Sequence, residues 1–500
     1  MPPTSSLSEL NTASTREPGP KVAESAAIDD AQFVAGLIAR ARIAQRDYEQ
    51  WDQQAVDEAV TAAAWAIVAP QRNRALAELA VAATGLGNVA DKIAKNRRKT
   101  MGLLRDLRGA RSVGVIARDP ARGLVEIARP VGVVAAITPS TNPGATPANN
   151  IINALKGRNA IILAPSPKGQ STLTLLLQFV HAELDRVGAP RDLVQQLPAP
   201  VSRGMTRELM QQADVVLATG SRNNVQAAYS SGTPALGVGV GNVVVIVDET
   251  ADIMAAADRI ARSKTFDNAT SCSSENSLVI VDSVYDEMLM ALTAQRGALL
   301  TPEETAQLQA AMFPDGKLSP AVVAKPAAEI ARSAGLTRPA LQDARFLMVA
   351  QTGVGARHPF SGEKLSPVLA VYRAADFAAA AALAQQVLEF EGAGHSVGLQ
   401  SNLPERAEWL GETLPVCRVI VNQAHCIATG GSYDNALPFS LSMGCGSWGG
   451  NSLSDNFNYK HLLNITRVVA PLPPGQVREP TEDELFGAYH RKYQAAAGDE

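Results

Sequence analysis

The stretch that decides the fold is VGVVAAITPSTNPGA, residues 131–145, in which an apolar run ends in a polar turn. An apolar run without polar alternation is typical of a strand that is buried on both faces of a sheet. Similar runs return three times further along the chain, with helical stretches between them, at residues 160–164, 214–218 and 242–247. Buried strands that alternate with helices predict an α/β fold with a doubly wound parallel sheet, which binds ligands beyond the carboxyl ends of its strands.

Upstream of this sheet the pattern is helical and then changes to a hairpin. Alanine is frequent over residues 29–108, and apolar residues such as Phe33 and Leu37 recur at helical spacing. Residues 112–128 predict two paired strands that protrude as a hairpin. The first 28 residues are rich in Pro, Ser, Thr and Glu, and they predict a disordered tail rather than a signal peptide.

A second round of helices and strands begins near Thr250. An amphipathic helix is expected over residues 250–264. Further apolar runs continue the strand series at residues 278–281, 368–371 and 419–422. We therefore expect a domain boundary near residue 250. The expected parts are a first domain over residues 29–250, a second over residues 251–440, and a return segment with a C-terminal arm over residues 441–500.

The composition excludes several classes of partner and site. The formal net charge is −4 with the two signs interspersed, so neither nucleic acid nor a membrane surface is expected as a partner. No run of 18 apolar residues occurs, so no membrane span is expected. The four cysteines form neither a disulfide framework nor a zinc-ligand pattern, which argues for a reducing cytoplasm and against a metal site.

The strongest candidate for chemistry is Cys272, in the segment FDNATSCSSEN of residues 266–276. This polar run of small residues lies between an amphipathic helix and an apolar strand, so the cysteine is expected on a turn. Small neighbours let a substrate approach, and backbone N–H groups in a turn can stabilise an oxyanion. The alternative is a buried structural cysteine, because free cysteine is usually buried and inert.

Four other loops could serve a ligand, although each is also ordinary turn or packing chemistry. ATGSRNNV follows a strand, where N–H groups at a helix start suit a phosphate. PALGVGVGN lets the backbone approach a ligand closely, but it precedes a strand and is not the dinucleotide fingerprint. ITPSTNPGA carries Thr141 and Asn142, and GCGSWGGN forms a tight loop around Trp448. ATGSRNNV is residues 218–225, PALGVGVGN is 234–242, ITPSTNPGA is 137–145 and GCGSWGGN is 444–451.

Taken together, these segments resemble the acylating, coenzyme A-dependent aldehyde dehydrogenases, a family that includes the aldehyde domain of bifunctional alcohol/aldehyde dehydrogenases. The likeness is collinear from about residue 131 to residue 464. Its markers are TNP at 141–143, ATG at 218–220, AYSSG at 228–232, GVGVGN at 237–242, SKTFDN at 263–268, EKLSP at 363–367, GAGHS at 392–396 and GCGSWGGNS at 444–452. Within the family, NATSCSSEN at 268–276 and VNQAHCIATG at 421–430 most resemble the group that oxidises sulfoacetaldehyde.

The resemblance implies an aldehyde dehydrogenase-like fold and a covalent mechanism. Residues 29–250 would bind the nicotinamide cofactor and residues 251–440 would be catalytic, with the hairpin and the arm serving a homodimer or homotetramer. Cys272 matches the nucleophile that forms a thiohemiacetal and then a thioester, which the thiol of coenzyme A takes over. The loop at 237–242 lacks the glutamate that activates water in hydrolytic relatives, which favours acyl transfer to coenzyme A.

Further roles follow from the same resemblance. Asn142 is expected to stabilise the oxyanion, with Thr141 as the other candidate at that position, and His395 is a candidate acid, base or partner of the coenzyme A thiol. Glu363 matches the glutamate that holds the nicotinamide ribose. The other expected cofactor contacts are Thr141, Asn142, Ser166, Lys168, Gly220, Ser221 and Gly239. Ser166 and Lys168 follow the second strand, without an acidic neighbour, and favour NADP over NAD.

For the substrate, the loop over residues 422–433 departs from the bifunctional enzymes and offers His425, Thr429 and Ser432 as donors for a sulfonate. The expected reaction converts sulfoacetaldehyde, coenzyme A and NAD(P)⁺ reversibly into sulfoacetyl-CoA and NAD(P)H. The alternatives are another small aldehyde such as acetaldehyde or succinate semialdehyde, and a hydrolytic aldehyde dehydrogenase. A cysteine acyltransferase or hydrolase without redox chemistry, and a binding protein with an idle Cys272, also remain open.

Overall fold

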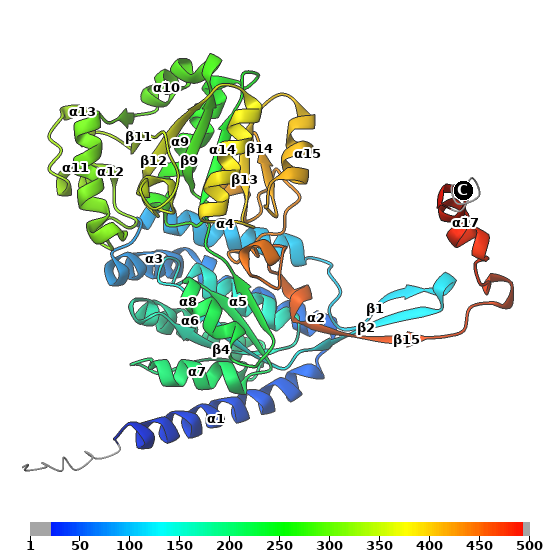
Figure 1. The fold of residues 1–500 in the computed structure, drawn as a ribbon. Coiled ribbons are helices and arrows are strands. Elements are labelled where there is room, and N and C mark those ends of the chain that lie inside the picture. The colour runs from blue at the N-terminus through cyan, green and yellow to red at the C-terminus, as the bar shows by residue number, and fades with distance from the viewer. Residues whose placement is uncertain (1–21, 494–500) are drawn as a thin grey trace, which may run out of the picture.

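The computed structural model describes residues 22–493, with side chains from residue 30 onward. It contains two α/β units with a parallel sheet each, and a thin extension (Figure 1). The predicted tail of residues 1–28 lies outside the described residues as far as residue 21. Its last seven residues belong to helix α1, Val22–Glu49.

The first sheet has five parallel strands in the order β5-β4-β3-β6-β7. Strands β3 and β4 are buried along their whole length because every residue in them is apolar, small or a terminal Thr or Pro, which confirms the prediction of a doubly wound sheet. Helices α5 and α6 with α2 form one layer, and α1 lies with α7. The strands are β3 Val133–Thr138, β4 Ala160–Pro165, β5 Val194–Gln196, β6 Val215–Thr219 and β7 Ala235–Val238. The helices are α2 Gln53–Val68, α5 Ala145–Lys156, α6 Gln170–Arg186, α7 Arg203–Gln212 and α8 Arg222–Tyr229.

The second sheet has seven parallel strands in the order β10-β11-β12-β9-β8-β13-β14. One apolar core packs on each of its faces, around α9 and α10 on one side and α11, α12 and α14 on the other. The strands are β8 Val243–Val247, β9 Glu275–Val281, β10 Gly297–Leu299, β11 Phe346–Ala350, β12 Val368–Ala374, β13 Val397–Gln400 and β14 Val419–Val421. The helices are α9 Ile253–Thr265, α10 Tyr285–Ala294, α11 Pro302–Met312, α12 Ala327–Ser333, α13 Pro339–Gln342, α14 Phe377–Phe390, α15 Pro404–Thr413 and α16 His425–Ala428.

The chain passes from the first α/β unit to the second at strand β8, which is earlier than the sequence predicts. The sequence placed residues 242–247 in the first sheet, with a boundary near residue 250. In the structure β8 pairs with β9 and β13, so the chain enters the second sheet at Val243. An apolar strand has the same sequence pattern in either sheet, since both sheets bury it on both faces.

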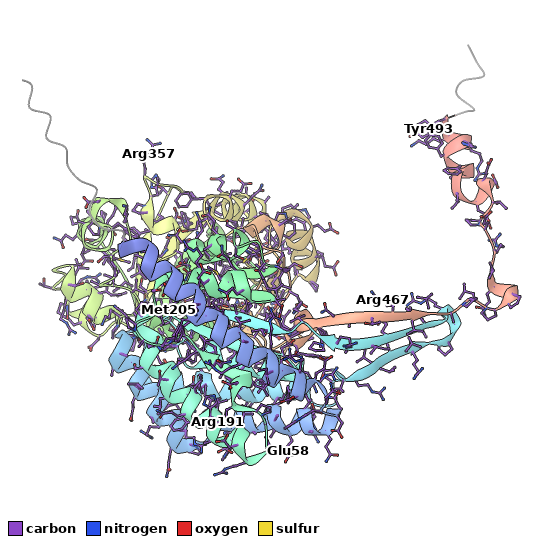
Figure 2. All side chains as sticks on the ribbon, turned by 90° about the horizontal axis from the view of Figure 1, so that it is seen from below. Glu58, Arg191, Met205, Arg357, Arg467 and Tyr493 are labelled. Carbon is purple, nitrogen blue, oxygen red and sulfur yellow. The ribbon has the colours of Figure 1, made fainter. Side chains whose placement is uncertain are left out.

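The extension consists of an antiparallel three-stranded sheet and a terminal helix. The hairpin predicted at residues 112–128 is formed by β1, Gly114–Asp119, and β2, Leu124–Pro130. Strand β15, Leu463–Val469, pairs with β2, and Arg467 bonds Glu126 across the pair at 3.0 Å. Figure 2 shows Arg467 on the extension and Tyr493, in α17 (Glu482–Tyr493), far from the body of the molecule.

Helices α3, Pro70–Thr84, and α4, Val89–Leu107, complete the described fold, and α4 lies between the two α/β units (Figure 1). It buries five polar side chains, Lys92, Lys95, Asn96, Lys99 and Thr100. Among residues 22–493, no helix has the length and apolar content needed to cross a lipid bilayer.

Candidate active site

Cys272 lies on a turn between η4, Phe266–Ala269, and β9, as the sequence predicts. The three residues Asp267, Asn268 and Ala269 have positive φ angles of 50°, 51° and 59°. This left-handed conformation is unfavourable, above all for alanine, so the surrounding contacts must hold the backbone in it.

Asp267 provides those contacts by joining the turn to helix α4. Its buried carboxylate accepts hydrogen bonds from Lys95 Nζ at 2.6 Å, from Lys92 Nζ at 3.0 Å and from the Asn88 N–H at 2.9 Å. Burial opposes ionisation, but the ammonium groups of Lys95 and Lys92 hold the pKa of Asp267 below its usual value. The buried ion-pair network therefore fixes the segment that presents Cys272.

A cleft of about 600 Å³ opens beside Cys272, which is half-buried in its wall. A volume of this size is typical of a site for a small ligand or cofactor. The cleft brings together the ends of β3, β4, β6 and β7 with the Cys272 turn and the segment before β12. The predicted site residues that line it are Thr141, Asn142, Ser166, Gly220, Ser221, Gly239, Cys272 and Glu363.

His395 is the nearest titratable partner of the cysteine. Its Nε2 lies 3.4 Å from Cys272 Sγ, and its Nδ1 shares a 2.7 Å hydrogen bond with Ser396 Oγ. Burial and the charge of Arg418 lower the pKa of His395 well below its ordinary value, so the imidazole is neutral. Burial and the Glu363 carboxylate raise the pKa of the Cys272 thiol. The resting pair is therefore a protonated thiol beside a neutral imidazole, with Nε2 within hydrogen-bond distance of the sulfur.

Lys95 also sets the orientation of Asn142, which lines the cleft. Lys95 Nζ donates to Asn142 Oδ1 at 2.8 Å. The amide nitrogen is thereby left to donate to a ligand, as an oxyanion requires. Thr141 contributes its backbone carbonyl to Lys92 Nζ at 3.2 Å. This arrangement favours Asn142 over Thr141 as the donor to an oxyanion.

The glycine-rich loop at residues 237–242 packs directly under the nucleophile. A Cβ added to Gly241 would lie 2.1 Å from the Cys272 carbonyl oxygen, so only glycine fits there. Val238, Gly239 and Val240 of this loop line the cleft, and the loop carries no carboxylate. Water in the cleft therefore finds no general base on this loop.

Two buried polar atoms in the cleft fit a nicotinamide cofactor. Ser166 Oγ and Glu363 Oε1 have no hydrogen-bond partner within the described part of the chain, and such orphaned atoms are costly unless a ligand satisfies them. The backbone N–H of Glu363 is bonded to Glu391 at 2.8 Å, which positions its side chain. Lys168 is exposed just beyond Ser166 and does not line the cleft.

The three predicted sulfonate donors do not line the cleft. Thr429 Oγ1 donates to the His425 carbonyl at 2.7 Å, and His425 Nδ1 lies 2.9 Å from the Ser273 carbonyl. Ser432 Oγ accepts a hydrogen bond of 2.8 Å from Arg98 Nη2.

Sequence reasoning missed the cations of α4. The signal was present, since Lys92, Lys95, Arg98 and Lys99 recur at intervals that place them on one face of a helix.

A second cleft of about 560 Å³ adjoins the first and shares Arg222, Gly239, Val240 and Glu391 with it. Trp448 and Tyr229 line this second cleft, and Trp448 is 56% exposed. The tight loop around Trp448, residues 444–451, is thus at the rim of a cavity.

Comparison with known proteins gives consistent matches. Residues 8–314 match the model of the aldehyde dehydrogenase family. The chain is 62% identical to the sulfoacetaldehyde dehydrogenase (acylating) of Cupriavidus necator, over 92% of each chain. It is 38% identical to the succinate-semialdehyde dehydrogenase (acetylating) of Clostridium kluyveri, over 90% of this chain and 98% of that one. The crystal structure of an acetylating aldehyde dehydrogenase from Geobacillus thermoglucosidasius superimposes with a TM-score of 0.86 at 36% identity, covering 91% of this chain and 99% of the other.

Proposed function

The chain belongs to the aldehyde dehydrogenase family, in its acylating branch, and from this we propose that it oxidises sulfoacetaldehyde to sulfoacetyl-CoA with NADP⁺. The observation that carries the proposal is Cys272 Sγ at 3.4 Å from a neutral His395, in a cleft whose adjoining glycine loop has no carboxylate. The overall reaction consumes aldehyde, coenzyme A and NADP⁺, and it yields the thioester, NADPH and one proton.

In the first step, Cys272 Sγ attacks the aldehyde carbon and its proton passes to His395 Nε2. The amide nitrogen of Asn142 donates to the developing oxyanion, because Lys95 holds the amide oxygen at 2.8 Å. The product is the oxyanion of a thiohemiacetal on Cys272. His395 then releases its proton to solvent and returns to the neutral form that burial favours.

A nicotinamide bound in the cleft would supply the acceptor for the hydride of the former aldehyde carbon, whose loss would leave a thioester on Cys272. Glu363 and Ser166 have the free buried oxygens to hold the two riboses of the cofactor. Ribose hydroxyls bonded in this way would fix the cofactor in the cleft next to the sulfur.

In the second half-reaction, the thiol of coenzyme A loses its proton to His395 and its sulfur attacks the thioester carbon. The Cys272 sulfur leaves and receives that proton from His395, so the site returns to its starting state. Water competes poorly with this thiol, because the loop under Cys272 carries no carboxylate to activate it.

The preference for NADP rests on the segment after β4. Ser166 lies in the cleft and Lys168 stands exposed two residues later, where the 2′-phosphate of the adenosine ribose would lie. No acidic residue occurs in APSPK, residues 164–168, to repel that phosphate. A cytoplasmic setting fits the four free cysteines.

The extension supports assembly into a homodimer or homotetramer. Its third strand, its terminal helix and the segment between them expose apolar side chains that a monomer would leave in water: Val468, Val469, Val477, Leu485, Phe486 and Tyr489. Measurement of the molar mass in solution, with and without residues 463–493, tests this assignment.

Product analysis tests the catalytic proposal. Sulfoacetaldehyde should sustain the reduction of NADP⁺ beyond one turnover only when coenzyme A is present, with sulfoacetyl-CoA identified by mass spectrometry. Formation of free sulfoacetate at the same rate without coenzyme A would instead assign the enzyme to the hydrolytic branch. Equal kcat/KM for acetaldehyde and sulfoacetaldehyde would refute the charged substrate.

A further inference from the structure

A small cavity adjoins the main cleft on the side of α4. Its volume is about 30 Å³, which holds two or three water-sized groups. It shares Asn142, Ser271, Leu441 and Met443 with the main cleft. Ser271 and Ser273, the two neighbours of Cys272 in the chain, both line it. The cavity is therefore next to the nucleophile.

Three cationic side chains of α4 line this cavity, but they are not equivalent. Lys95 is fully engaged, since it donates to Asp267, Asn142 and Thr270. Arg98 and Lys99 have no carboxylate within 4 Å anywhere in residues 30–493. They are the two cations of the cavity that form no ion pair with a described carboxylate, and Asp434 acts on Arg98 only from a greater distance.

Uncharged oxygens are the hydrogen-bond partners of these two cations. Arg98 donates to the Ile427 carbonyl at 3.1 Å and to Ser432 Oγ at 2.8 Å. Lys99 donates one hydrogen bond, of 2.5 Å, to the Gly430 carbonyl, although an ammonium has three N–H donors. The loop over residues 427–432 thus holds the cations in place and leaves donors free for a ligand.

Burial makes the arrangement costly unless an anion is bound. Lys99 is only 7% exposed, and burial together with the charge of Arg98 lowers its pKa to about 7. Two cations side by side, neither of them in an ion pair, are electrostatically unfavourable in a partly desolvated site. An anion placed between them would remove this penalty.

We propose that this cavity binds the sulfonate group of the aldehyde substrate, with Arg98 and Lys99 as its cationic ligands. The inference rests on the proposed function and assigns the part of the same site that selects a charged aldehyde. Only one methylene group separates the sulfonate from the carbonyl carbon of sulfoacetaldehyde, so the anion site must lie next to the nucleophile. A cavity lined by both neighbours of Cys272 meets this requirement.

The chemistry of the cavity suits a sulfonate in particular. Its three oxygens carry one fixed charge and accept several hydrogen bonds at once, and the cavity offers ammonium, guanidinium and the hydroxyls of Ser271 and Ser273. Leu441 and Met443 form an apolar wall, which strengthens each charge interaction. Because the cavity is next to the nucleophile, it disfavours succinate semialdehyde, whose carboxylate is one methylene further from the carbonyl carbon.

Substrate selectivity provides the test. In Lys99→Met and Arg98→Gln, kcat/KM for sulfoacetaldehyde should fall about 10- to 100-fold, the range for losing one hydrogen bond to a charged group. The kcat/KM for acetaldehyde should stay within about twofold of wild type, which also shows that the variant is folded. The matched control is Arg97→Gln, because Arg97 is an exposed cation on the same helix. An equal loss for both aldehydes would overturn the proposal and assign these residues a structural role.

A binding measurement separates this inference from the proposed function, because it needs no turnover. Ethanesulfonate should bind wild type and Arg97→Gln and protect Cys272 from iodoacetamide, whereas Lys99→Met and Arg98→Gln should be unprotected. If wild type oxidises sulfoacetaldehyde with coenzyme A but all four proteins bind ethanesulfonate equally, the sulfonate site is refuted and the proposed function stands. If wild type does not turn over sulfoacetaldehyde, the proposed substrate itself fails.

Discussion

Cys272 Sγ lies 3.4 Å from Nε2 of His395, an imidazole whose other nitrogen is bonded to the Ser396 hydroxyl. The pair resembles the sulfur–imidazole arrangement of cysteine nucleophiles, but a hydroxyl takes the place of a carboxylate behind the ring. A hydroxyl does not stabilise an imidazolium strongly, so the histidine passes a proton on without retaining it. The following predictions depend on this pair and on the contacts around it.

Replacing the nucleophile should abolish the reaction and leave the fold intact. Cys272→Ala should lower kcat by more than about 10³-fold, because the covalent route is lost. NADPH formation with sulfoacetaldehyde and coenzyme A measures the effect. Cys417→Ala is the control, since Cys417 does not line the cleft. Loss of activity in the control alone would contradict the assignment of Cys272.

Replacing His395 should slow both half-reactions. His395→Asn should reduce kcat about 10²- to 10⁴-fold, the usual contribution of a general acid–base. Because burial holds the pKa of His395 well below 6.5, the wild-type profile should show no histidine inflection between pH 6 and 7. Stopped-flow measurement of the NADPH burst, and of thioester transfer after it, resolves the two steps. An unchanged burst together with unchanged transfer would exclude His395.

Breaking the ion-pair network behind the nucleophile should destabilise the whole enzyme. Asp267→Asn leaves Lys92 and Lys95 buried without their shared counter-charge, a change that costs about 3–5 kcal/mol. Urea unfolding measures the cost, and kcat should fall in parallel because the Cys272 turn loses its support. As a control, Asp258→Asn breaks the exposed pair with Arg262 and should cost less than about 1 kcal/mol.

The choice of cofactor should respond to Lys168. Lys168→Ala should raise KM for NADP⁺ about tenfold, the size expected for one hydrogen bond to a charged group of about 1.5 kcal/mol. The KM for NAD⁺ serves as the internal control and should change little, because NAD⁺ has no 2′-phosphate. A parallel rise for both cofactors would mean that Lys168 does not contact that phosphate.

Selectivity for the charged aldehyde should depend on pH. Lys99 is protonated below its pKa of about 7 and neutral above it, so the ratio of kcat/KM for sulfoacetaldehyde to that for acetaldehyde should fall as pH rises through 7. The groups that bear on this pKa are Arg98, Lys95, Cys426 and Cys272. The ionisation of the coenzyme A thiol affects kcat/KM for both aldehydes equally, so it does not change their ratio. In Lys99→Met the ratio should be low and independent of pH.

Much of the fold could be predicted from the sequence, because strands buried on both faces have a distinctive composition. The runs at β3, β4 and β6 were assigned within two residues of their observed bounds. The sheet that β8 joins was not predictable, since burial alone does not identify a strand's neighbours. Nor was the pairing of β15 with β2, which depends on a contact between segments more than 330 residues apart.

At the site, the sequence identified residues whose type is unusual for their context. Cys272 among small polar residues and the glycine loop without a carboxylate are such cases. The charged face of α4 was missed because lysines and arginines on a helix normally face solvent, and only the position of α4 between the two units buries them.

The four residues between β7 and β8, positions 239–242, carry the chain from one α/β unit into the other, and they touch the backbone of Cys272. A displacement of one unit against the other would strain this tetrapeptide, and Gly241 would pass that strain to the backbone that carries the sulfur. The position of the nucleophile is therefore tied to the relative position of the two units.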